Sequence, residues 1–252
     1  MARLKVICSM TKFADFTIRI LVALGLAGLF MNPSFTSAAD SSVNPDTLPM
    51  FGQPKIVRPD NLKSVDESFI RDSTLRYKTR QAASAAFAAQ GWSSLKSQQL
   101  DTAMLRFNQA WLLNGKNYAA FWGFGAVLSA RGRLLEAIEQ LEAARELIDE
   151  PAQRPALLCD LATLHSEYAA GLPADRQLER AQRFVGANNR FTESLENDPT
   201  FATAWREWAM SLYEQERYGE AWAKVKRAQE LRAEPLPPEF LKKLSAKMAE
   251  PK

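Results

Sequence analysis

The sequence predicts an all-helical protein built from stacked copies of one helical hairpin. The 252-residue chain has only 11 glycines and is rich in Ala, Leu, Glu, Gln and Arg, which favour helices. Small residues also return every 34 residues, since Ala103 recurs as Ala137 and Gly91 recurs as Gly125. A fixed interval of this length is typical of stacked structural units, which usually form binding surfaces rather than catalytic sites.

Residues 1–39 have the layout of a secretory signal peptide and are set apart from the fold. Four basic side chains precede the apolar run 20–31, and small residues that suit cleavage follow it. The run is shorter than the stretch of about 20 apolar residues that a membrane span needs. We therefore expect cleavage after Ala38 or Ala39 and no stable membrane span in the mature chain.

Removing this leader changes the charge of the chain. The leader holds four basic residues and one acidic residue, so residues 40–252 carry 28 of each and no net charge. The basic excess therefore gives no reason to expect a nucleic-acid partner. Translation can begin at Met1 or at Met10, and the sequence leaves both open.

Cys159 is the only cysteine after the leader, so no disulfide can form within the mature chain. Its leucine neighbours favour a buried apolar residue, and the alternative is a thiol that pairs with another chain. The cysteine poverty and the absence of an N-x-S/T glycosylation acceptor favour a bacterial periplasm over a eukaryotic lumen.

A proline-rich arm and a leading helix precede the repeats. Residues 40–63 contain four prolines without apolar periodicity, which predicts a flexible or extended arm. Ser64 and Glu67 then have the spacing of a capping box. We expect a leading helix over 64–83, with a break near Thr79.

Four helix-turn-helix units follow, over 84–117, 118–151, 152–201 and 202–235. Apolar residues at three- and four-residue spacings indicate the helices. The third unit carries 16 extra residues, because Ala187 lies 50 residues after the equivalent residue of the second unit instead of 34. We expect two longer helices there, about 153–170 and 174–197.

This pattern resembles the tetratricopeptide repeat, a 34-residue helical hairpin with small and aromatic residues at fixed positions. The matching residues are Phe87, Gly91, Ala103, Phe107 and Ala110; Phe121, Gly125, Ala137, Leu141 and Ala144; Ala187, Phe191, Ser194 and Pro199; and Trp205, Ala209, Tyr218, Ala221, Val225, Ala228 and Pro235. The resemblance implies a right-handed α-solenoid over 84–235, closed by a capping helix and tail at 236–252.

The resemblance also implies that the first helix of each unit lines a concave groove that binds a protein or peptide. The groove positions carried onto this chain are Trp92, Leu95, Lys96, Asn117, Trp122, Arg206, Met210 and Tyr213, with Ala119, Thr203 and Glu214 beside them. Trp, Tyr and Arg are frequent at binding hot spots. The alternative is that Trp92 and Trp122 pack against the leading helix or against each other.

The sequence carries no recognisable catalytic or metal-binding motif. His165 is the only histidine, and no phosphate-binding loop or nucleophile elbow occurs. We expect no catalytic residue, no cofactor and no metal, in a monomeric scaffold or assembly factor of the bacterial envelope.

Two other functions stay open at this point. The first is an enzyme or enzyme subunit that acts on cell-wall glycan, which a buried, isolated carboxylate in a deep cleft would favour. The second is a solenoid that closes over a small apolar ligand, which would require a covered pocket.

Overall fold

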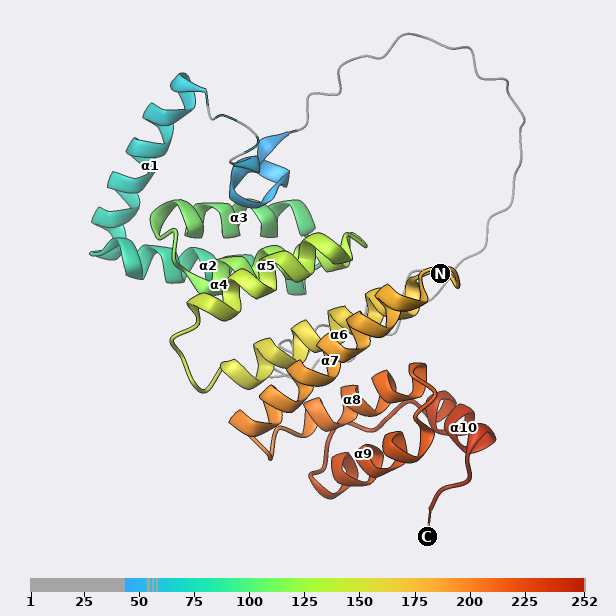
Figure 1. The fold of residues 1–252 in the computed structure, drawn as a ribbon. Coiled ribbons are helices and arrows are strands. Elements are labelled where there is room, and N and C mark those ends of the chain that lie inside the picture. The colour runs from blue at the N-terminus through green and yellow to red at the C-terminus, as the bar shows by residue number, and fades with distance from the viewer. Residues whose placement is uncertain (1–43, 54, 56, 58, 252) are drawn as a thin grey trace, which may run out of the picture.

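The computed structural model describes residues 44–53, 55, 57 and 59–251, and the predicted signal peptide lies outside this range. The described residues form ten α-helices and two short 3-10 helices, without a strand, so the all-α prediction is confirmed (Figure 1). The helices are η2 (Pro45–Thr47), η3 (Pro49–Gly52), α1 (Asp60–Tyr77), α2 (Arg80–Lys96), α3 (Leu100–Leu113), α4 (Tyr118–Ala130), α5 (Leu134–Leu147), α6 (Arg154–Gly171), α7 (Gln177–Asn197), α8 (Ala202–Glu214), α9 (Tyr218–Glu230) and α10 (Pro238–Lys247).

The helices pair into four hairpins that follow one another in chain order. The pairs are α2 with α3, α4 with α5, α6 with α7, and α8 with α9. Each hairpin packs on the next, and Figure 1 shows them succeeding one another from the green end of the molecule to the red end. Helix α1 packs on the first hairpin, and α10 follows the last one.

The first two hairpins share the same close contact between their helices. A methyl group added to Gly91 would lie 2.6 Å from Cε1 of Phe107, and one added to Gly125 would overlap Leu141. Phe107 and Leu141 are fully buried. Because each member of one pair lies 34 residues after its counterpart in the other, the sequence period corresponds to a repeated packing contact.

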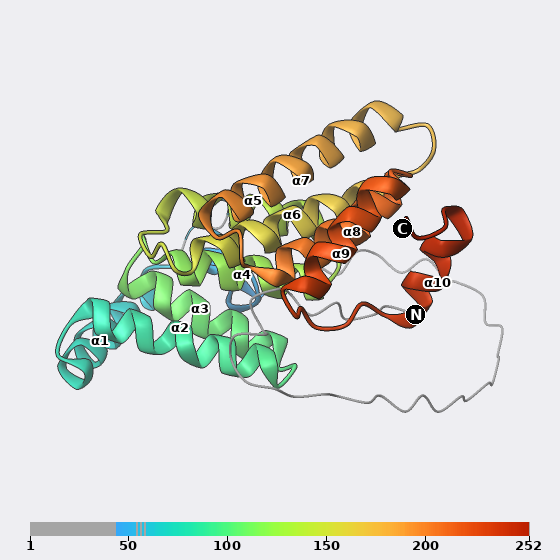
Figure 2. The same ribbon diagram turned by 90° about the horizontal axis from the view of Figure 1, so that it is seen from below.

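The third hairpin is the longest of the four. Its helices α6 and α7 lie close to the predicted ranges 153–170 and 174–197, and Pro173 lies in the turn between them. Figure 2 shows α7 running to the edge of the molecule, where the connection from α6 lies. The 16 extra residues therefore lengthen a hairpin without interrupting the succession of hairpins.

The leading helix starts earlier than the sequence predicts. Helix α1 begins at Asp60 directly after Pro59, so Ser64 lies inside it and the predicted capping box does not open a helix. Proline fixes its own φ and its ring suits the start of a helix, which makes Pro59 the stronger signal. The predicted break is present, since Lys78 has a φ of 71° and Thr79 caps α2 by accepting a hydrogen bond from the Ala82 N–H.

The described part of the proline-rich arm also differs from the prediction of a flexible or extended segment. Helices η2 and η3 lie against α3, and the ring of Phe51 in η3 is buried.

Among the described helices, none has the length and apolar character needed to cross a membrane.

Candidate functional site

Two of the predicted groove residues of the first two hairpins, Leu95 and Trp122, lie inside the protein. Trp122 is only 4% exposed, and Leu95 is equally buried. The rings of Trp92 and Trp122 meet edge to face, with centroids 5.7 Å apart. The two indoles therefore pack against each other, which is one of the alternatives that the sequence left open. Leu95 and Trp122 are core residues in this structure. Trp92 stays partly exposed and also contacts Phe107.

Trp122 joins the second hairpin to the third through a buried hydrogen bond. Its Nε1–H donates to Oδ2 of Asp160 on α6 at 2.9 Å, and Asp160 is 1% exposed. A hydrogen bond to a carboxylate in a poorly solvated setting is stronger than one between neutral groups. The sequence analysis passed over Asp160, although an acidic residue alone in the apolar run 155–162 was a signal that could have found it.

Asn117 joins three helices. Its Oδ1 caps α4 by accepting from the Ala119 N–H at 2.9 Å. Its Nδ2 donates to Oγ of Ser84 on α2 at 2.7 Å, and that hydroxyl donates to the backbone oxygen of Ala110 on α3. Asn117 therefore holds α2, α3 and α4 together through its side chain.

A third polar contact links α6 to α8. The hydroxyl groups of Ser166 and Ser211 lie 2.6 Å apart, and both side chains are buried. Together with the contacts of Asn117 and Trp122, this bond completes a series that joins α2 to α4, α4 to α6, and α6 to α8. Each step between the first helices of the four hairpins thus has one polar contact, which is partly buried at the first step and buried at the other two.

The predicted residues on α8 form a second, separate group. Arg206 pairs with Glu207, and both side chains are largely covered. Met210 and Tyr213 pack on the C-terminal hydrophobic cluster, where the ring of Tyr213 lies 5.6 Å from that of Phe240 on α10. This cluster is distinct from the one that contains Trp92 and Trp122, so the structure does not bring all the predicted positions together.

The predicted positions differ in how much of each side chain reaches solvent. Lys96 and Glu214 are exposed. Trp92, Asn117, Arg206, Met210, Tyr213, Ala119 and Thr203 are half-buried. The most accessible of these positions are therefore Lys96 at the end of α2 and Glu214 at the end of α8.

The only histidine belongs to a charged cluster between α5, α6 and α7. Nε2 of His165 lies 3.9 Å from Oε1 of Glu142. The Glu142 carboxylate also pairs with Arg145 through Oε2 at 2.7 Å and with Arg190 through Oε1 at 3.4 Å. His165, followed by the two arginines, lowers the pKa of Glu142 to about 2, while partial burial acts in the opposite direction. No group of three or more potential metal ligands occurs among the described residues.

No family model matches the chain, and no curated protein matches it. The functional assignment therefore rests on the chain's own residues and their arrangement.

Proposed function

We propose that this chain is an exported α-solenoid of the tetratricopeptide type that binds a protein or peptide along its first helices. It acts as a non-catalytic scaffold or assembly factor in the bacterial periplasm. The observation that carries the proposal is the contact of Gly91 with Phe107, which recurs 34 residues later between Gly125 and Leu141. A glycine that leaves room for a large apolar side chain at the equivalent position is what stacked copies of one hairpin require.

The spacing of the helices supports the choice of the first helices as the binding face. Helix α2 packs against α4, and α6 packs against α8, whereas α4 and α6 are less closely packed, as are the second helices of neighbouring hairpins. In a curved stack, the side on which successive helices come closest is the concave side. The series of polar contacts at Asn117, Trp122 and Ser166 fixes the spacing of the helices on that side.

The exposed and half-exposed side chains define what this face offers a partner. Trp92, Arg206 and Tyr213 are of the types most often found at binding hot spots, and each keeps part of its surface accessible. Lys96 and Glu214 supply opposite charges at the two ends of the face. Trp122 packs edge to face against Trp92, and only 4% of its own surface is exposed. A mixed aromatic and charged face of this kind suits a protein or peptide partner.

The buried carboxylate of Asp160 does not provide the observation that would favour a cell-wall enzyme. Its side chain lies in the interior, where it accepts the hydrogen bond from Trp122. A substrate in solution cannot reach a group that is 1% exposed. The hollow lined by Gln98, Asp101 and Arg131 is shallow and open, unlike the covered pocket that a small apolar ligand requires.

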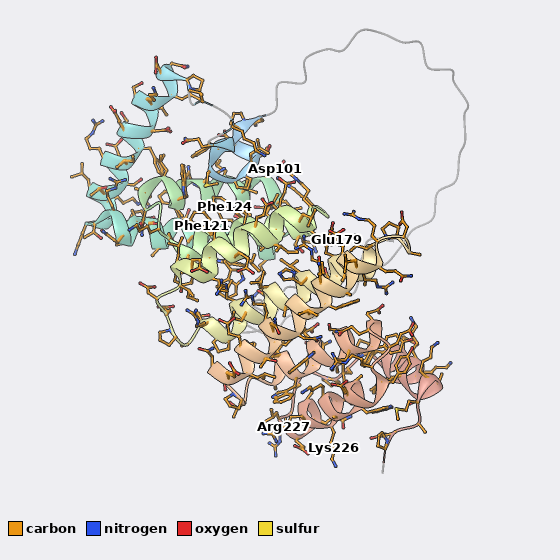
Figure 3. The ribbon with its side chains drawn as sticks, viewed as in Figure 1. Asp101, Phe121, Phe124, Glu179, Lys226 and Arg227 are labelled. Atoms are coloured by element: carbon orange, nitrogen blue, oxygen red, sulfur yellow. The ribbon has the colours of Figure 1, made fainter. Side chains whose placement is uncertain are left out.

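The proposal is tested by reversing charges on the proposed binding face without disturbing the core. The full chain carries a C-terminal tag, and bound proteins are recovered from envelope extract and quantified for wild type and for Lys96→Glu/Glu214→Lys. The matched control is Glu139→Lys/Lys226→Glu, which makes the same exchange on the second helices α5 and α9; Lys226 is labelled on the outer side of α9 in Figure 3. Because all four side chains are exposed, both variants should keep the wild-type melting temperature.

The expected result is that at least one envelope protein is lost from the first-helix variant and kept by the control. Capture of the same proteins in the same amounts by all three chains contradicts the proposal.

A further inference from the structure

The segment at residues 44–53, called here the docked segment, lies against α3 and not on the proposed binding face. Its helices η2 and η3 both contact α3, which is the second helix of its hairpin (Figure 1). Val57, between this segment and α1, is 83% exposed. The body of the protein therefore holds a short piece of its own chain, and Lys55 and Val57, the described residues that follow it, are exposed.

Asn108 on α3 binds the backbone of the docked segment at three points. Its Nδ2 donates to the backbone oxygens of Leu48 at 2.8 Å and of Asp46 at 3.2 Å. Its Oδ1 accepts from the N–H of Phe51 at 3.1 Å. The side chain is fully buried, and a buried carboxamide of this kind reads peptide groups rather than particular side chains. Asn108 belongs to none of the positions that match the repeat pattern.

Two further groups complete the contact. Arg131, at the end of α4, donates from Nη1 to the backbone oxygen of Thr47 at 2.7 Å. Its other terminal nitrogen pairs with Asp101 on α3, which orients the guanidinium, and Figure 3 labels Asp101 beside the docked segment. The ring of Phe51 is 4% exposed and is the main apolar anchor, with Met50 partly buried next to it.

These contacts have the chemistry of peptide recognition. Backbone oxygens and one N–H are bound by fixed side chains of the body, and a single aromatic ring is buried. Met50 and Phe51 adopt left-handed φ values of 53° and 54°, which non-glycine residues rarely take. This strain and the entropy of ordering the segment both oppose docking. Docking therefore depends on the hydrogen bonds of Asn108 and Arg131 and on the burial of the Phe51 ring.

We propose that α3 carries a peptide-binding site, occupied in this structure by residues 44–53, that also accepts the same peptide when it is supplied as a separate molecule. The ligand class is a short turn-forming peptide with two backbone oxygens for Asn108, one for Arg131 and an aromatic side chain for the apolar site. This site is separate from the first-helix face, so it goes beyond the proposed function and neither depends on the other.

The test uses the full chain with a protease site inserted at Val57. A synthetic peptide of residues 44–53 carries a fluorophore, and its binding is followed by fluorescence anisotropy before and after cutting. Before cutting, the tethered segment occupies the site at a high effective concentration, so little labelled peptide should bind. After cutting, the labelled peptide should bind saturably, and unlabelled peptide should displace it.

Two variants identify the site. Asn108→Ala in the cut chain should weaken binding about tenfold or more, because three hydrogen bonds are lost. Asn114→Ala is the matched control at the C-terminal end of α3, where the side chain accepts a hydrogen bond from the Lys116 N–H. This variant should bind the peptide as the unsubstituted chain does. A peptide with Phe51→Ala tests the apolar site without changing the body, and it should bind about tenfold or more weakly.

Three outcomes would overturn the proposal. The first is a cut chain that binds no labelled peptide. The second is equal affinity for the peptide and its Phe51→Ala variant. The third is loss of helical circular dichroism when the segment leaves, which would make residues 44–53 part of the core rather than a ligand.

Discussion

The contact between Gly125 and Leu141 can be tested by adding a single methyl group. In Gly125→Ala the new carbon would overlap the fully buried Leu141 side chain and lie 3.0 Å from the backbone oxygen of Ala137. Overpacking of this kind costs about 1–3 kcal/mol. The higher helix propensity of alanine offsets about 1 kcal/mol of that cost. We expect a net loss of about 1 kcal/mol in the free energy of unfolding.

Gly171 provides a matched control at the end of α6. A methyl group there would meet no atom within 4 Å. Gly171→Ala should therefore be more stable than the wild type by about 0.4–1 kcal/mol, because alanine lowers the conformational entropy of the unfolded chain. The two glycine-to-alanine changes should therefore differ by about 2 kcal/mol in urea unfolding followed by circular dichroism.

A double-mutant cycle assigns the loss to the contact itself. Leu141→Ala alone should cost about 2–5 kcal/mol, because it opens a cavity in the core. The added methyl of Gly125→Ala fills part of that cavity, and only its 3.0 Å approach to the backbone oxygen of Ala137 remains. The double variant should therefore be more stable than the sum of the single changes predicts, by about 1–2 kcal/mol. Additive behaviour, or a Gly125→Ala variant as stable as Gly171→Ala, would refute the reasoning.

Three further predictions concern the interior. Phe107→Ala should lower the free energy of unfolding by about 3–5 kcal/mol, measured in urea, because the side chain is fully buried. Trp122→Phe should cost about 1.5–3 kcal/mol in the same assay, since it removes the hydrogen bond to the buried Asp160 carboxylate. The pKa of Glu142 is lowered from 4.5 to about 2, so its ionised form stabilises the fold above about pH 4.5, and this contribution is lost as the pH falls towards 2. Glu142→Gln should therefore be less stable than the wild type at pH 6 by about 1–2 kcal/mol, a figure reduced because one third of the Glu142 side chain is exposed. Between pH 5 and pH 2, the free energy of unfolding of this variant should change less than that of the wild type.

The sequence predicted the hairpins well because their signals are local. The 34-residue interval and the Gly171–Pro173 turn place the ends of α6 and α7 within a few residues of the observed ones. The start of α1 was wrong because two local signals compete there. Pro59 opens the helix before the capping-box residue Ser64 is reached.

The candidate binding face was less predictable, because periodicity identifies the face of a helix and not what covers it. Trp122 occupies a predicted groove position, and it is covered because Asp160 of the lengthened third hairpin lies against it. The docking of residues 44–53 depends in the same way on Asn108, which lies more than fifty residues further along the chain. Prolines without apolar periodicity give no sign of such a partner.

Site-specific photo-crosslinking in intact cells tests the central claim most directly, which is that a partner binds along the first helices. A photo-reactive residue replaces Lys96 or Glu214 on the first helices, and Glu139 or Lys226 on the second helices, one position at a time. Adducts with the same partner should form from positions 96 and 214 and be absent from positions 139 and 226. Adducts that form only from the second helices, or equally from all four positions, would contradict the claim.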